Sequence, residues 1–230
     1  MALPHFSVVL PVYNQGDHLD NIIRGYVAAL DGAGIGWQLV VVPNACRDDS
    51  ADICRGLSSW DPRIRVVELE LGGWGRAVRA GLAHSDGDSL CYTNSARTTP
   101  EMLVDALRFS ADHPEVVVKA QRKIRDNLRR QAGSLVYNLE CRLLFGLATW
   151  DINGTPKVFP RRYEQLLALR RDDDLIDAEF VMTCRRFGYP IVELPISITV
   201  RHGGRSTTRL SSAWKMYRGA YDMSRERWRR

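Results

Sequence analysis

Short, uninterrupted apolar runs alternate along the first half of the chain with segments whose apolar residues recur at helical spacing. The runs predict buried strands over residues 6–11, 37–42, 65–69, 89–93 and 116–119. The periodic segments predict helices over residues 20–30, 48–57, 75–82 and 100–109. This strand–helix alternation is typical of an α/β fold, with a mostly parallel sheet covered by helices on both faces.

The second half predicts further elements of both kinds. A long helical stretch is expected over 122–145, a loop leading into a strand over 151–159, a helix over 177–187 and a strand over 191–200. Residues 209–230 predict a basic terminal helix, in which Leu210, Trp214, Tyr217 and Tyr221 form one aromatic stripe. Two interpretations of this helix stand: the stripe packs on the domain, or the helix lies at an anionic membrane surface.

Composition limits the class of protein. The 230 residues, 45% of them apolar, suffice for one sizeable core, and no apolar run approaches the length of a membrane helix. The first eleven residues lack the features of a secretory signal. Five scattered cysteines without CxxC spacing predict neither a zinc site nor a disulfide framework. We therefore expect a cytoplasmic protein with reduced thiols.

Positive charge is concentrated at one end of the chain. The net charge is +5, but residues 201–230 alone carry nine Arg and Lys side chains against two acids, and a second basic run spans 122–130. Such local basicity indicates an anionic partner, either phosphate groups or a membrane surface. No RNA-binding aromatic motif or helix-turn-helix pattern accompanies it, so nucleic acid is not expected.

The predicted topology locates a candidate site. In parallel α/β sheets, ligands bind where loops leave the carboxyl ends of strands. The corresponding loops here are residues 11–14, 43–48, 72–76 and 94–97.

Several motifs in these loops, in order, resemble glycosyltransferase family two. Ser7–Asn14 resembles the opening S-x-V-I-P-x-Y-N-E strand, and Gly73–Gly81 resembles the N-x-G-x-G-x-A-x-R-x-G segment. The run D-I-N-G-T-P-K at 151–157 and D-A-E at 177–179 resemble later landmarks. Arg201–Ser206 resembles the R-x-x-G-x-S of the dolichyl- and polyprenyl-phosphate sugar transferase branch.

The resemblance implies a GT-A domain over residues 1–208, followed by the terminal helix. Such enzymes transfer a sugar from a nucleotide diphosphate, here a GDP- or UDP-sugar, to an acceptor with inversion. The expected nucleotide-sugar-binding residues are Pro11, Tyr13, Asn14, Asn44, Asp48, Arg76, Asn94, Arg201, Arg205 and Ser206. Among them, the arginines suit the donor diphosphate because guanidinium groups bind phosphate oxygens bidentately.

The chain departs from the family pattern where acids are expected. The D-D-G-S-x-D segment reads Pro43–Asp48 here, so Asp48 alone remains of its three acids. The D-x-D metal motif falls on Thr93 and Ser95 or on Asn94 and Ala96, neither of which supplies a carboxylate. Mg²⁺ and Mn²⁺ prefer carboxylate oxygens, so a metal cofactor is doubtful, and no organic cofactor is expected.

Two explanations of the missing motif remain open. In the first, transfer proceeds without a metal, and Arg97 helps to neutralise the departing diphosphate. In the second, the site has degenerated, and the chain binds a nucleotide sugar, a lipid or a partner enzyme without catalysis.

The acceptor is also open. A hydroxyl acceptor needs a carboxylate to take its proton, for which Asp177 and Glu179 are candidates, with Asp151 as a further one. A lipid phosphate needs no base, and the basic run that includes Arg122 and Arg125 would hold it. Acceptor-binding residues are accordingly expected to be Arg122, Arg125, Asp151 and Lys157. The sequence predicts no oligomeric state.

Overall fold

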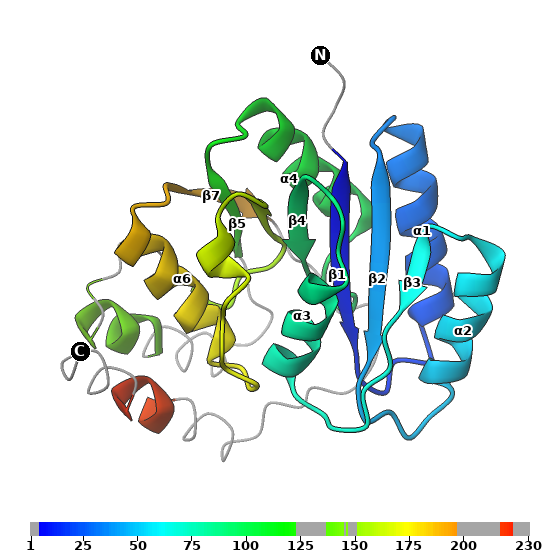
Figure 1. Ribbon diagram of the computed structural model, residues 1–230, viewed down its shortest axis with the longest axis horizontal. Coiled ribbons are helices and arrows are strands. Elements are labelled where there is room, and N and C mark those ends of the chain that lie inside the picture. The colour runs from blue at the N-terminus through cyan, green and yellow to red at the C-terminus, as the bar shows by residue number, and fades with distance from the viewer. Residues whose placement is uncertain (1–4, 123–136, 145, 147–150, 197–216, 223–230) are drawn as a thin grey trace.

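A seven-stranded, twisted sheet forms the centre of the computed structural model, which describes residues 5–122, 137–144, 146, 151–196 and 217–222 (Figure 1). The strand order is β3-β2-β1-β4-β6-β5-β7. All neighbouring strands run parallel except at β6, which is antiparallel to both β4 and β5. The α/β fold class expected from the sequence is therefore confirmed.

Strands and helices alternate through most of the chain. The strands are β1 (Phe6–Val12), β2 (Trp37–Pro43), β3 (Ile64–Val66), β4 (Ser89–Tyr92), β5 (Val117–Arg122), β6 (Lys157–Pro160) and β7 (Ile191–Ile196). The helices are α1 (Leu19–Gly32), α2 (Ser50–Trp60), α3 (Trp74–Ala83), α4 (Pro100–Asp112) and α6 (Ile176–Phe187), with a 3-10 turn η1 (Glu164–Leu166). Residues 137–144 and 217–222 are also helical.

Two hydrophobic clusters lie on opposite faces of the sheet. Val8 and Leu10 of β1 belong to the cluster that contains the buried faces of α1, α2 and α4. Val9 points the other way, into the cluster with α3 and α6. Gly81 lets α3 approach β1 closely, because a Cβ there would lie 2.2 Å from Val9 Cγ1. Burial on both faces explains why the strands are continuous apolar runs.

The later elements differ from expectation in two respects. Arg122, expected to open a long helix, has its backbone at the end of β5. Residues 123–136 of that expected helix lie outside the described residues, and helix is found at 137–144. In the second difference, β6 runs antiparallel between β4 and β5, which no local pattern predicted.

The described part of the terminal helix packs on the domain. Ala220 is fully buried in the cluster with α6, and the Tyr217 ring packs edge-on against Tyr137 at 5.8 Å. Tyr221 is half-exposed. The stripe residues Leu210 and Trp214, and the expected boundary at 208–209, lie outside the described residues. No helix in the part of the chain that the structure describes is long and apolar enough to cross a bilayer.

Candidate functional site

The carboxyl ends of β1, β2 and β4 meet at one edge of the sheet, where the predicted site loops lie (Figure 1). Asn44, 4% exposed, connects three of these segments through its side chain. Its Nδ2 donates to Val12 O at 2.7 Å and to Val42 O at 3.3 Å. Its Oδ1 accepts from the Gly73 N–H at 3.1 Å. The amide expected to bind the nucleotide is therefore engaged within the protein.

Other predicted residues border the same edge. Pro11 is buried in β1, and Tyr13 is 40% exposed, so its ring is not part of the core. Asn14 has a left-handed backbone (φ 50°), and its Oδ1 accepts from the Arg47 N–H at 2.7 Å. A nucleoside contact at Tyr13 and Asn14 stays a prediction.

Asp48 fixes the loop that follows β2. Its two carboxylate oxygens accept from the Gly16 N–H at 3.0 Å and from the Ser50 N–H at 3.2 Å. Burial opposes ionisation, but the hydrogen bonds from Ser50 and Gly16 outweigh it and lower the pKa of Asp48. Asp48 is therefore held as an anion by backbone donors.

The turn after β4 contains neutral polar side chains that form hydrogen bonds within the protein. Asn94 Oδ1 accepts from the Ala96 N–H at 2.9 Å, which shapes the turn. Thr93 and Thr98 share a hydroxyl–hydroxyl bond of 2.7 Å, and Ser95 Oγ donates to Gln15 Oε1. Arg97 lies in this turn, partly exposed.

The end of β4 offers no carboxylate side chain to a hard divalent cation. Both alternative alignments of the D-x-D motif supply only amide, hydroxyl or methyl side chains, and the hydroxyls of Thr93 and Ser95 are fully buried in their own bonds. Within the described ranges, no three His, Cys, Asp or Glu side chains gather as metal ligands would.

Arg76 is paired with an acid of its own chain. Its Nη2 lies 2.9 Å from Asp172 Oδ2, while Arg79 Nη1 lies 2.6 Å from Asp172 Oδ1. The backbones of the same two residues are also hydrogen-bonded, because the Arg76 N–H donates to Asp172 O. The Arg76 hydrogen bond is the main cause that lowers the pKa of Asp172. A ligand phosphate would therefore have to displace or share this carboxylate to reach Arg76.

The two candidate bases have different surroundings. Both carboxylate oxygens of Glu179 accept backbone N–H groups, from Arg170 at 3.0 Å and from Arg171 at 2.9 Å, so this side chain fixes the loop before α6. Asp177 is 4% exposed, and its Oδ1 accepts from Tyr92 Oη at 2.9 Å and from Lys157 Nζ.

The residues expected to bind an acceptor are also inside the protein. Lys157 is completely buried, and burial lowers its pKa against the opposing charge of Asp177. Asp151 is 5% exposed, and its carbonyl accepts from Lys119 Nζ at 3.0 Å. Roles for both in acceptor binding stay predictions. Arg125, Arg201, Arg205 and Ser206 lie outside the described residues, as does the Arg122 side chain.

The sequence interpretation missed four polar residues of this region: Tyr92, Lys119, Asp174 and Glu193. Lys119 is a charged residue inside an apolar strand run, which was a usable signal. Asp174 stands just before α6, and burial of its carboxyl group, with the charge of Asp177, raises its pKa to about 6. Tyr92 looked like an ordinary core residue.

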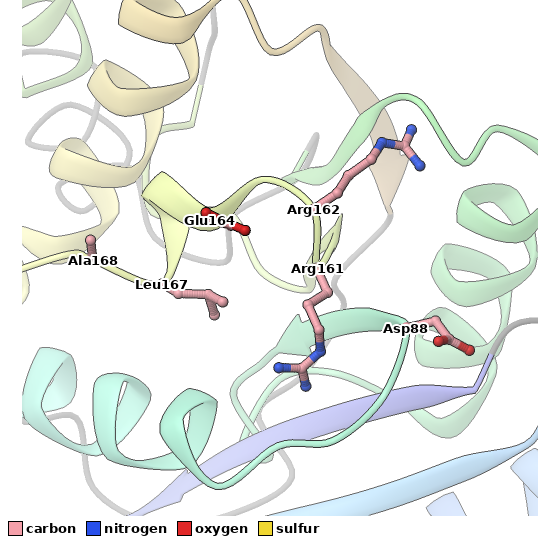
Figure 2. A pocket seen from close by; sticks show the side chains of 6 residues that line it. All are labelled: Asp88, Arg161, Arg162, Glu164, Leu167 and Ala168. Atoms are coloured by element: carbon pink, nitrogen blue, oxygen red, sulfur yellow. The ribbon is translucent and has the colours of Figure 1, made fainter.

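A cavity of about 760 Å³ lies at the opposite edge of the sheet. Asp88, just before β4, and Arg161, just after β6, line it together with Arg162, Glu164, Leu167 and Ala168 (Figure 2). The Arg161 guanidinium donates to Gly87 O at 2.7 Å and to Ser85 O at 2.6 Å. The guanidinium group of Arg161 is thus hydrogen-bonded to backbone carbonyl groups. This cavity is remote from the predicted site loops.

The sheet, its order of elements and the site at its carboxyl edge define a GT-A fold, the architecture of nucleotide-sugar transferases. The chain belongs to Glycosyl transferase family 2, whose model matches residues 7–167.

Bacterial lipid-linked sugar transferases are among its relatives. The chain is 30% identical over 158 residues to the undecaprenyl-phosphate 4-deoxy-4-formamido-L-arabinose transferase of Salmonella paratyphi A, covering 67% of this chain and 48% of that protein. It is 33% identical over 138 residues to the Edwardsiella ictaluri protein of the same name, covering 58% and 42%. The chain thus spans about half the length of the curated relatives it matches.

Solved structures support the fold. Glucosyl-3-phosphoglycerate synthase from Mycobacterium tuberculosis, in complex with Mn²⁺, uridine diphosphate and phosphoglyceric acid, superposes with a TM-score of 0.72. The match covers 95% of this chain and 76% of that one, at 19% sequence identity. At this identity the likeness establishes the fold alone.

Proposed function

We propose that this protein transfers a sugar from a nucleotide-diphosphate donor, a GDP- or UDP-sugar, to a polyprenyl phosphate or another small acceptor, with inversion and without a divalent metal. Family membership and the relatives named for undecaprenyl-phosphate transfer support the reaction class. The observation that carries metal independence is the end of β4, where Asn94, Ser95 and Ala96 replace carboxylate ligands and bond within the protein.

Without a metal, cationic side chains must offset the charge that develops on the departing diphosphate. Arg97 stands in the β4 turn itself and is our candidate for this task, with Arg201 and Arg205 as further cations. Arg76 contributes once the diphosphate competes with Asp172, whose ion pairs are partly exposed and therefore weak.

Nucleotide release from UDP-glucose and GDP-mannose tests this proposal. We expect the same rate in EDTA and in Mg²⁺ or Mn²⁺, and a loss of about 100-fold in Arg97→Ala, the typical cost of removing one group that stabilises transition-state charge. Arg108→Ala, on the exposed side of α4, is the matched control and should keep the wild-type rate. A strict requirement for a divalent cation would contradict the proposal.

A second candidate is a nucleotide-sugar-binding protein without catalysis. The same neutral β4 turn favours it, together with the pairing of Arg76 with Asp172. Saturable binding of UDP or GDP, with no nucleotide release under any condition or acceptor, would favour this candidate.

We also propose that the protein acts at the cytoplasmic face of a membrane as a peripheral protein. The nine basic residues at 201–230 and the lipid-linked acceptor named for its relatives support this. Flotation with vesicles that contain phosphatidylglycerol, but not with neutral phosphatidylcholine vesicles, is the expected result. Absence of the protein from both floated vesicle fractions would contradict the membrane proposal.

A further inference from the structure

One row of polar side chains crosses four strands beneath the candidate site. Tyr92 on β4 pairs in register with Lys157 on β6, Lys157 with Lys119 on β5, and Lys119 with Glu193 on β7. Because directly opposed residues project to the same face, these side chains form one continuous line. Tyr92 and both lysines are completely buried, and Lys119 Nζ lies 2.7 Å from Glu193 Oε1.

Asp177 from α6 completes the row above its Tyr92 end. A single carboxylate oxygen, Oδ1, accepts both the Tyr92 hydroxyl and the Lys157 ammonium group. The Lys157 Nζ is also 5.1 Å from the centroid of the Tyr92 ring, so the three groups form one compact cluster. The second oxygen, Oδ2, takes no part in these two contacts, and 6% of the side chain stays accessible.

Stability does not explain this cluster well. Removing the Lys157 ammonium group and the Asp177 carboxylate from water costs free energy that their mutual attraction only partly repays, and apolar replacements of buried ion pairs are often as stable. Two donors on one oxygen do, however, fix the rotamer of the Asp177 carboxylate. A carboxylate fixed in this way, with its second oxygen outside the two contacts, can accept a proton from a hydroxyl placed beside that oxygen.

Three other carboxylates of this edge are already engaged, and a fourth, Asp174, titrates near pH 6 beside Asp177, whose charge helps to raise its pKa. Both oxygens of Glu179 accept hydrogen bonds from backbone N–H groups, and so do both oxygens of Asp48. Asp172 is divided between Arg76 and Arg79. Asp177 combines burial, fixed orientation and an oxygen outside its structural contacts.

We propose that Tyr92 and Lys157 are positioning residues that hold Asp177 as the proton acceptor, and that the acceptor substrate is therefore an alcohol. This inference rests on the transferase function proposed above. The acceptor O–H bond breaks and its proton passes to Asp177 Oδ2, while the oxygen forms a bond to the anomeric carbon. The bond from that carbon to the diphosphate oxygen breaks, and its electron pair leaves with the nucleoside diphosphate. A phosphate acceptor is already ionised and needs no such group.

The test is the pH profile of nucleotide release by the full chain, with water as the acceptor and then with added undecaprenyl phosphate. UDP-glucose and GDP-mannose serve as donors. The variants are Tyr92→Phe, Lys157→Met and Asp177→Asn. Tyr92→Phe changes the shape of the core least and is the principal variant, because Lys157→Met leaves a buried carboxylate without its counter-ion. Tyr163→Phe is the matched control, since its hydroxyl donates to Glu115 O at the opposite edge.

We expect kcat/KM for hydrolysis by the wild-type protein to fall as the pH is lowered. In Tyr92→Phe this fall should begin about one pH unit higher, which is the equivalent of one lost hydrogen bond to a carboxylate. We expect Tyr163→Phe to keep the wild-type profile. Asp177→Asn should lose about 100-fold or more, and undecaprenyl phosphate should not restore it.

Three results would overturn the inference, and they are distinguishable. An unshifted acid limb in folded Tyr92→Phe would remove the positioning role. Wild-type transfer to undecaprenyl phosphate by Asp177→Asn would remove the alcohol acceptor. Absence of nucleotide release in the wild-type chain would contradict the proposed function itself, and this inference with it.

Discussion

Asn44 stands where the family pattern has an acid, so restoring that acid tests how the site loops are held together. In Asn44→Asp, the group that donates to Val12 O at 2.7 Å and Val42 O at 3.3 Å becomes an oxygen that faces both carbonyls. The bond from the Gly73 N–H is retained. Two buried hydrogen bonds are lost at about 1 kcal/mol each, and the unsatisfied carbonyls add about 1 kcal/mol more.

The expected loss is therefore about 3 kcal/mol in the free energy of unfolding at pH 7, or about 6–12 °C in Tm for a chain of this size. The introduced carboxyl lies in a buried place beside carbonyl oxygens, which raises its folded-state pKa above the unfolded value of about 3.9. The deficit is thus greatest above the folded-state pKa, and it shrinks as pH falls through that pKa, because the protonated group can donate to Val12 O.

Urea unfolding followed by tryptophan fluorescence at pH 7 and pH 4.5 measures both the size and the sign. Asn94→Asp is the matched control, since its Oδ1 acceptor for the Ala96 N–H is retained, and it should cost less than about 1 kcal/mol. Wild-type stability of Asn44→Asp at pH 7, or a deficit that grows toward pH 4.5, would refute the reasoning.

Three further outcomes follow from the packing and charges. Gly81→Ala should lower the free energy of unfolding in urea by about 1–3 kcal/mol, because the added Cβ would meet Val9 Cγ1. Gly32→Ala, with open space around it, is the control and should be neutral or stabilising. Equal effects of the two substitutions would contradict the close approach of α3. Asp172→Asn should cost less than about 1 kcal/mol near pH 7 because its pairs are exposed. The folded-state pKa of Asp172 is lowered, so its carboxylate stabilises the fold above the unfolded-state pKa, and this stabilisation disappears as the pH falls through the folded-state pKa. A stability difference between Asp172→Asn and wild type that persists in acid would contradict the pairing. The same variant frees Arg76, so UDP or GDP should bind several-fold more tightly by calorimetry, and weaker binding would show that Asp172 supports the ligand.

Much of the fold is predictable from the sequence because parallel strands buried on both faces appear as continuous apolar runs. Val8, Val9 and Leu10 are all buried, although they point to different clusters. The observed β1, β2 and β4 agree with the predicted runs to within a residue at each end. The place of β6 is not encoded locally, because its partners on β4 lie more than sixty residues away in the chain.

In the candidate site, too, the position of the loops was predictable from the sequence, whereas the side-chain contacts were not. The predicted loops do meet, because the carboxyl ends of parallel strands share one edge. What each side chain contacts was not predictable: Asn44, Arg76 and Glu179 each bind another part of the chain, and these partners follow from tertiary placement. The row from Tyr92 to Glu193 depends on the register of four strands, which no single segment specifies.

Calorimetric titration of UDP and GDP into the purified full chain, once in EDTA and once in Mg²⁺, tests most directly the claim of a nucleotide-sugar site that needs no metal. We predict that one nucleotide binds with a micromolar Kd, equivalent to about −8 kcal/mol, and that the Kd is the same in both buffers. Binding that appears only with Mg²⁺ would contradict it, and would mean that carboxylates other than the missing pair hold the ion.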